Sequence, residues 1–506
     1  MDLFTGMKMG FSVAVMPQNM LYCLFGVTLG TLIGILPGIG PAATLALLLP
    51  MTFGMNPASA MIMMAGIYYG AMYGGSTTSI LLSIPGESSS VMTCLDGYQM
   101  AKKGRAGPAL AIAAISSFIA GTFGVVMLML VAVPLANSAL KFGPPEFFAL
   151  MLWGLSAVAY LSEKSLLKAL IMAAFGVFVS TIGVDIVTGT DRFTYDQAEI
   201  LDGIDFLILI VGFFAVSEVL LSIEKEGKAE IFQAPRKMRE LMPSKKDMRD
   251  SSGAITRGTL TGFLLGIIPG VGPSVASFLA YGLEKRFAKR KDLIGTGAIE
   301  GVASPEAANN AAATAALIPL LCLGIPSSGV AAIMLGALIL NNVRPGPMLL
   351  QEHPDLVWGV IGSMYIGNVI LLILNLPMVP FLAQILRVPY YILYPLILLL
   401  SFVGVYSVNN SLFDIYLLLF FGILGYGLRK MDFPMAPAIL GIVLGPRMEL
   451  ALRQSLILSH GSWTIFFTEP ICAVLLVGLF LMLVSRPLKK WIGGTIRRRR
   501  QNLAGH

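Results

Sequence analysis

Long apolar runs follow one another along almost the whole chain, and several are interrupted by glycine and proline. Two runs carry the same interruption: residues 30–41 read GTLIGILPGIGP and residues 262–273 read GFLLGIIPGVGP. Proline removes a backbone N–H donor and clashes with the preceding turn, so a helix cannot continue straight through either phrase. In hydrocarbon, broken backbone is tolerated only where protein or a water-filled cavity satisfies it. Two matching breaks in two halves of a chain therefore favour a binding site of the kind found in transporters.

A second pair of breaks follows the first in each half. Residues 84–90 read IPGESSS, and residues 324–329 read GIPSSG. Before each break lies a helical stretch with small and polar residues, YYGAMYGGSTTS at 68–79 and EAANNAAAT at 306–314. These stretches are too polar for a lipid-facing surface and are expected to line a cavity or to pack against other helices.

Composition places these runs in a membrane. The chain has 506 residues, of which 56% are hydrophobic and 12% are charged, and its mean hydropathy is +0.80. Soluble domains carry about 25% charged residues. The predicted fold is an all-α, polytopic integral membrane protein with about 11–12 membrane segments, including re-entrant or broken helices. Helices are expected near 108–136, 145–161, 165–188 and 203–223 in the first half.

Charge divides the chain and orients it. We expect a first membrane repeat at 1–224, a cytoplasmic connecting loop at 225–255, a second repeat at 256–486 and a basic cytoplasmic tail at 487–506. Lysine and arginine prefer cytoplasmic loops. The loop after the first PGxGP phrase has no basic residue, whereas KRFAKRK at 285–291 follows the second. Equivalent loops thus prefer opposite sides, which predicts two inverted-topology repeats with the binding site at their interface.

Both flanks of residues 258–283 are basic. Each arm of this segment is about 11 residues, roughly 16 Å of helix or half of a hydrocarbon core. We therefore favour a re-entrant hairpin with its tip near the midplane. A single spanning helix with a kink is the alternative.

The breaks supply candidate ligands for a carboxylate. Interrupted helices expose N–H groups at a positive dipole end, and glycine lets the backbone approach a ligand closely. The predicted substrate-binding residues are Pro37, Gly38, Gly40, Ser76, Thr77, Thr78, Ser88, Ser89, Gly270, Gly272, Asn309, Asn310, Ser327 and Ser328. For each there is a purely structural alternative: a kink, a helix cap, a bond back to the helix backbone or tight helix packing.

A cation would drive uptake of an anion. Freed carbonyls suit Na⁺, and carboxylates inside a membrane are functional candidates by default. The predicted coupling-ion residues are Gly38, Gly270, Glu87, Glu306 and Thr314. Asp96 is a further ionisable candidate, and Glu306 could instead serve the first turn of a helix. No cofactor is expected other than this ion, which is Na⁺ or H⁺.

Other functional classes have little support. The four cysteines are scattered without metal or disulfide spacing, and there is no G-x-x-x-x-G-K-[ST] or H-E-x-x-H motif. The net charge of +7 is explained by cytoplasmic loops, so no nucleic-acid partner is expected. The expectation is a protein that is not an enzyme. An intramembrane serine enzyme would depend on Ser462 beside His460, a pair more typical of a helix-end turn.

The doubled PGxGP phrase, YYGAMYGGSTTSILLSIPGE at 68–87 and GYGLRKMDFPMAPAILGIVLGPRMELALRQSL at 425–456 resemble the large membrane subunit of tripartite tricarboxylate transporters. The resemblance covers nearly the whole chain. It implies a multi-pass protein of the bacterial inner membrane, working with a small membrane subunit and a periplasmic substrate-binding protein. It also implies cation-coupled import of a di- or tricarboxylate such as citrate, by alternating access with an elevator or a rocking motion. A stand-alone carrier for another organic anion is the alternative.

Overall fold

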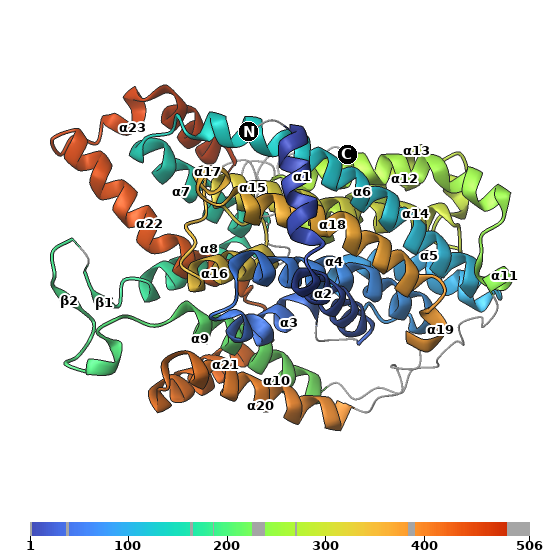
Figure 1. The fold of residues 1–506 in the computed structure, drawn as a ribbon, viewed down its shortest axis with the longest axis horizontal. Helices are drawn as coiled ribbons and strands as arrows, with labels where there is room; N and C mark the ends of the chain where they lie inside the picture. The colour runs from blue at the N-terminus through green and yellow to red at the C-terminus, as the bar shows by residue number, and fades with distance from the viewer. Residues whose placement is uncertain are drawn as a thin grey trace, which may run out of the picture.

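The computed structural model describes residues 3–36, 40–161, 165–185, 187–224, 238–268, 271–382 and 390–482, and these ranges are almost entirely helical (Figure 1). The first half contains α1 (Leu3–Ala14), α2 (Pro17–Ile35), α3 (Gly40–Leu48), α4 (Pro57–Leu82), η2 (Ser88–Ser90), α5 (Val91–Lys102), α6 (Ala106–Ala139), α7 (Pro144–Leu161), α8 (Leu166–Val179), α9 (Phe206–Ile210), the π-helical η4 (Val211–Val216) and α10 (Ser217–Ile223). Strands β1 (Gly183–Val184) and β2 (Asp191–Arg192) pair antiparallel between α8 and α9.

The second half repeats this mixture of long and short helices. It contains α11 (Met238–Leu241), α12 (Lys245–Gly266), α13 (Gly272–Phe287), α14 (Glu300–Ala315), α15 (Leu317–Leu323), α16 (Gly329–Leu340), α17 (Leu349–Glu352), α18 (Pro354–Asn375), α19 (Val379–Leu382), α20 (Tyr390–Asn409), α21 (Leu412–Lys430), α22 (Ala436–Leu458) and α23 (Ile465–Thr468). A further apolar helix spans Pro470–Met482.

Among the described residues, six helices are long and apolar enough to cross a bilayer: Pro17–Ile35, Ala106–Ala139, Phe206–Ile223, Glu300–Leu323, Pro354–Asn375 and Leu412–Lys430. Five shorter apolar helices accompany them. The prediction of an all-α polytopic membrane protein is confirmed.

Two helices form the centre of the bundle. Nearly every residue of α4 and all of α14 are buried, so neither helix has a lipid-facing stripe. Helix α2 packs along α4, and α12 packs along α14; α6 crosses to α14 and α18 crosses to α4. The polar residues that the sequence places on α4 and α14 therefore lie among helices and not against lipid.

Each of these helix pairs approaches through three glycines spaced four residues apart. A Cβ atom on any of the six would lie 2.2–2.5 Å from a carbonyl oxygen of the partner helix. The pairs are Gly26, Gly30 and Gly34 of α2 against Met63, Ile67 and Ala71 of α4, and Gly258, Gly262 and Gly266 of α12 against Ser304, Ala308 and Ala312 of α14. Small residues at this spacing let two backbones come into contact. The similarity between the two halves thus extends from the sequence to the helix packing.

Helices α12 and α13 form a helical hairpin. Arg257 on α12 donates two hydrogen bonds to Glu284 on α13, with N–O distances of 2.7 and 2.8 Å. Residues so far apart in sequence meet only if the chain reverses between them, near the PGxGP phrase. The kinked single helix considered from the sequence is not what the described residues form. Helix α12 begins at Lys245 with a capping box at Ser244, so regular helix extends into the predicted loop 225–255.

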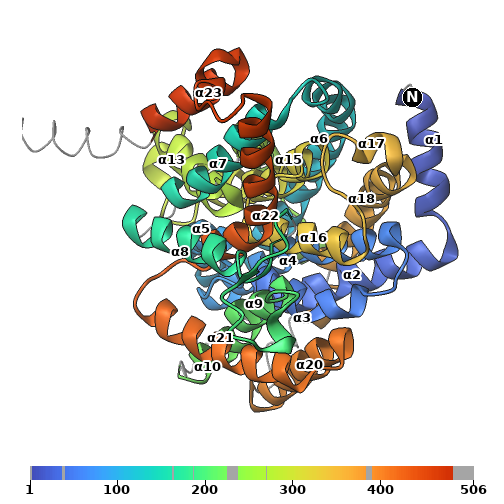
Figure 2. The ribbon, with the colours of Figure 1, turned by 90° about the vertical axis from the view of Figure 1, so that its left-hand side faces the viewer.

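The long axis of the molecule separates two ends (Figure 1). The basic end carries α11, the ends of α5 and α10, and an ion pair between Arg105 and Asp247. The opposite, strand end carries β1, β2 and the second half of α22. Figure 2, which looks along the axis from the strand end, shows α20 and α21 along one side of the bundle. The helix expected over 165–188 ends at Val179, because Gly183 and Gly189 adopt positive φ and the chain turns into the strands.

Candidate functional site

A cavity of about 470 Å³ lies between the two halves, and four helix N-termini line it. These are the starts of α3 at Gly40, η2 at Ser88, α13 at Gly272 and α16 at Gly329. We call it the central cavity. The first N–H groups of a helix have no partner within the helix and carry the positive end of its dipole. Four such ends around one space make it suited to an anion.

Two glycines at the start of α3 and α13 occupy equivalent positions in the cavity wall. Gly40 has a φ of +65° and Gly272 a φ of +62°, a conformation that side chains with a Cβ rarely adopt. A Cβ at Gly40 would meet nothing within 4 Å, and one at Gly272 would meet only Ser328 Cβ at 3.9 Å. The glycines are therefore required by the backbone conformation and not by a neighbouring atom.

The break after α4 connects the two halves across this cavity. The Ser88 hydroxyl lies 2.7 Å from the Ser274 hydroxyl, which follows the second PGxGP phrase. Glu87 caps η2 by accepting the Ser89 N–H at 3.0 Å, and the Ser89 hydroxyl also bonds this carboxylate. Gly86 lies against the backbone of Gly34, where a Cβ would be 2.0 Å from the carbonyl oxygen. This break therefore holds together elements that are distant in the sequence.

The matching break after α15 contributes Ser328. Its hydroxyl caps α16 by accepting the Ala331 N–H at 3.2 Å, the structural role considered from the sequence. The neighbouring Ser327 is buried, and its hydroxyl has no hydrogen-bond partner among the described residues. The Tyr68 hydroxyl lies near Ser328 on the cavity wall and also lacks a partner of normal geometry among the described residues. A buried hydroxyl of this kind can hydrogen-bond a ligand.

Arg429 at the end of α21 also lines the central cavity. It pairs with Glu218 and donates to the Ser217 hydroxyl at 3.2 Å, both on α10. Arg429 was not among the residues predicted from the sequence, because an arginine at a helix end beside Lys430 normally indicates only the orientation of the helix in the membrane. It lies within the GYGLRKMDFP stretch that carries the family resemblance, which was the available signal.

A second polar group lies one turn further along α4, around Glu306. Its carboxylate accepts hydrogen bonds from Ser76 at 2.7 Å, from Asn309 at 3.2 Å and from Thr93. Glu306 is fully buried and no cation lies beside it among the described residues. We call these four residues the Glu306 network. Met72 lines the central cavity and Ser76 follows it by four residues, so one turn of α4 separates the network from the central cavity.

Several other predicted residues serve helix packing. Asn310 donates to Ser117 at 2.7 Å, Thr314 bonds back to the Asn310 carbonyl at 3.0 Å, and Thr78 bonds back to Gly75 at 3.1 Å. Asp96 accepts the N–H groups of Gly295, Gly297 and Ala298, which fixes the turn before α14. Its carboxylate is engaged in this turn.

The structure thus divides the predicted site. It brings Gly40, Ser88, Gly272, Ser328 and Glu87 together around the central cavity. Nine predicted residues are not among those that line it: Ser76, Thr77, Thr78, Ser89, Asn309, Asn310, Thr314, Ser327 and Glu306. Pro37, Gly38 and Gly270 lie outside the described residues. Within the described ranges, no three His, Cys, Asp or Glu side chains gather as a metal site.

Burial, helix length and the interrupted helices around one cavity define the class: a multi-pass helical membrane protein with a site between its two halves. The chain belongs to the TctA family of the tripartite tricarboxylate transporters, whose family model matches residues 20–440. It is a component of a transport system.

Two similar proteins come from Agrobacterium vitis. An uncharacterized 52.8 kDa protein in the TAR-I ttuC' 3'region is 48% identical over 96% of both chains. An uncharacterized protein in the TAR-II ttuC' 3'region is 49% identical over 44% of this chain and 92% of its own length. No solved structure matches.

Proposed function

We propose that the chain is the large membrane subunit of a bacterial inner-membrane importer for a di- or tricarboxylate such as citrate. Family membership supports this proposal and implies the two partners, a small membrane subunit and a periplasmic substrate-binding protein. The basic end faces the cytoplasm and the strand end faces the periplasm, in line with the positive-inside rule. The two glycine-spaced helix pairs then belong to two inverted repeats that meet at the central cavity.

The central cavity holds the substrate carboxylates. Each carboxylate oxygen accepts hydrogen bonds from N–H groups at the starts of α13 and α16 and from hydroxyls such as Ser274. These contacts neutralise the anion without a dedicated lysine or arginine at every position, because helix N-termini supply partial positive charge. Arg429 adds a guanidinium group, which pairs with Glu218 on the same cavity wall. The convergence of four helix N-termini on one cavity is the observation that carries the proposal.

The coupling cation, Na⁺ or H⁺, binds one turn further along α4, at Glu306. A buried carboxylate without a positive partner is costly while ionised, so it favours uptake of a proton or a sodium ion. Glu87 is the second candidate, since it lies between the Glu306 network and the central cavity. Occupation of both regions would let the loaded protein change between outward- and inward-facing states, either by an elevator movement of the helical hairpins or by rocking.

Reconstitution of both membrane subunits in proteoliposomes tests this function. Labelled citrate, malate and succinate are offered with the periplasmic binding protein under an imposed Na⁺ or H⁺ gradient. Accumulation of at least one of them that collapses without the gradient supports the proposal. Absence of gradient-driven uptake for the whole panel, with a correctly assembled complex, would contradict it.

A further inference from the structure

A second cavity, of about 630 Å³, opens at the strand end of the molecule. Its volume is within the roughly 300–1,000 Å³ typical of small-molecule pockets. Four segments form its wall: the turn 142–144 before α7, the break at Leu323–Ile325, the turn Arg344–Pro347, and one face of α22. We call it the outer vestibule.

Of the described residues that line the outer vestibule, two are arginines and none carries a carboxylate. Arg447 on α22 has five N–H donors and donates one hydrogen bond to the Pro345 carbonyl at 3.1 Å, and its other donors have no further partner among the described residues. Arg344 is exposed and has no hydrogen-bond or ion-pair partner among the described residues. The two guanidinium groups lie close enough to repel each other. A bound anion would relieve this repulsion.

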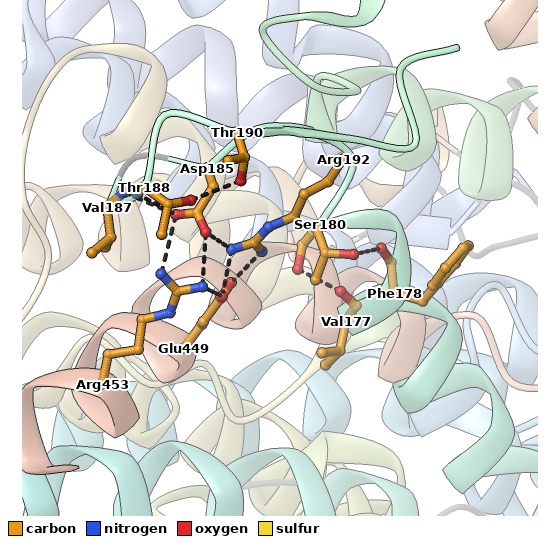
Figure 3. Close-up of polar contacts among 11 residues, drawn as sticks. Val177, Phe178, Ser180, Asp185, Val187, Thr188, Thr190, Arg192, Glu449 and Arg453 are labelled. Atoms are coloured by element: carbon orange, nitrogen blue, oxygen red, sulfur yellow. Dashed lines mark hydrogen bonds and ion pairs between the residues drawn. The ribbon is translucent and has the colours of Figure 1, made fainter. Parts of the chain in front are cut away.

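Three nearby acidic groups are already engaged. Glu146 accepts the Gly143 N–H at 2.9 Å at the start of α7. Glu449 on α22 pairs with Arg192 and Arg453, and Asp185 pairs with the same two arginines (Figure 3). These four residues form a closed and neutral network that holds the strand segment against α22. None of these acidic groups pairs with Arg344 or Arg447 in the part of the chain that the structure describes.

The outer vestibule and the central cavity lie on the two sides of one break. Leu323, Gly324 and Ile325 line the vestibule, whereas Ser328 and Gly329 line the central cavity. Gly324 has a φ of +70° and lies against the arginine turn, where a Cβ would be 3.0 Å from the Pro345 carbonyl oxygen. A small rearrangement of the break would therefore affect both cavities.

We propose that the outer vestibule is a second binding site, in which Arg344 and Arg447 hold a di- or tricarboxylate before it passes the break at 324–329. This inference rests on the proposed function and adds to it the place where the periplasmic protein releases its ligand. Guanidinium groups bind carboxylates through paired hydrogen bonds, so two of them select ligands with at least two carboxylates. The substrate is thus bound twice on its way through the protein.

A thiol-protection experiment tests the site without depending on transport. Gln454 lies on the vestibule wall and is exposed, so Gln454→Cys can be labelled with a negatively charged thiol reagent in the assembled complex. The same measurement is made after adding Arg344→Gln and Arg447→Gln. Citrate is the probe, and sodium chloride of equal ionic strength is the control. Lys141→Gln removes an exposed charge from the same end outside the vestibule wall and serves as the matched variant.

The expected result is that citrate slows labelling at least about threefold, that the double variant abolishes this protection, and that Lys141→Gln keeps it. In uptake, the double variant should raise KM about tenfold while kcat changes less than about twofold, because the central cavity is intact. Labelling that citrate does not slow, or a wild-type KM in the double variant, would overturn the inference. So would protection by anionic lipid in place of citrate. Normal uptake with any of these results leaves the proposed function standing, whereas failure of the wild-type complex to transport contradicts that function itself.

Discussion

The central cavity and the Glu306 network lie one helical turn apart along α4, and they differ in how their polar groups are satisfied. In the network, both carboxylate oxygens of Glu306 already accept hydrogen bonds from neighbouring side chains. In the cavity, the Tyr68 hydroxyl has no partner of normal geometry among the described residues, and the starts of four helices line the space, two of them capped by Glu87 and Ser328. The first arrangement suits a small cation or proton held by one carboxylate. The second has hydrogen-bonding capacity left for a larger anion.

The largest expected effect is at the cavity wall. Gly272→Val forces a β-branched residue into a φ of +62° and adds methyl groups to the cavity, so uptake should fall at least about 100-fold. Gly282→Val is the matched control, because Gly282 is exposed on the same helix and a Cβ there meets nothing within 4 Å. Initial rates of citrate uptake in proteoliposomes measure both. Equal uptake rates for the two variants would show that the central cavity is not on the transport path.

Glu306→Gln should separate the two regions. Without a titratable carboxylate, gradient-driven accumulation should fall by about tenfold or more, while citrate exchange across the membrane without a gradient should continue. Glu352 is an exposed acidic residue at the strand end, and Glu352→Gln should leave both accumulation and exchange at the wild-type rate. If exchange and accumulation fall together in Glu306→Gln, the network and the cavity act as one site and the comparison is wrong.

A moderate effect is expected at Arg429. Arg429→Gln removes the only arginine among the residues that line the central cavity, so KM should rise about tenfold. Lys430→Gln is the neighbouring control, because Lys430 pairs with Glu224 away from the cavity. Uptake rates at varied citrate concentration decide the point. An unchanged KM in Arg429→Gln would show that the guanidinium group only pairs with Glu218 and does not contact the substrate.

Tyr68 and Tyr69 offer a smaller and sharper test. Both hydroxyls are buried without a partner among the described residues, but only Tyr68 lines the cavity. Tyr68→Phe should raise KM about threefold, the effect of one neutral hydrogen bond, and Tyr69→Phe should leave KM unchanged. The same change in both would show a general effect of the helix and not a ligand contact.

The smallest effect on transport is expected at Asp185, outside both regions. Its burial raises its pKa, but hydrogen bonds from Arg453, the Val187 N–H and Arg192 outweigh this and hold the pKa well below the usual range. A lowered pKa stabilises the fold at every pH above the unfolded value of about 3.9 and is lost only as pH falls through the folded value. The difference in melting temperature between wild type and Asp185→Asn should therefore stay constant from pH 8 to pH 5. A difference that disappears between pH 7 and pH 5 would contradict this arrangement.

The sequence predicted the features that depend on local chain chemistry. Runs of apolar residues predicted the helices, and proline with glycine predicted the breaks before Gly40, Ser88, Gly272 and Gly329. The two-residue strands at 183–184 and 191–192 were missed, because strands this short show no alternation of polar and apolar positions.

The division of the site could not be predicted, since it depends on which helices pack against each turn of α4. A helix that is buried on all sides has no polar face to mark direction, so Ser76 could not be separated from the residues near the cavity. Arg429 reaches the cavity because α21 packs on α10, and spacing along the sequence does not predict this contact between helices. The resemblance to the family indicated the segment that contains Arg429 but not the role of this residue.

The most direct test is a structure of the assembled membrane complex with citrate bound. The account predicts density for citrate in the central cavity, within hydrogen-bond distance of the backbone N–H groups of Gly272 and Ser274 and of residues 328–330. Citrate bound beside Glu306, or at a position that contacts neither α13 nor α16, would contradict it.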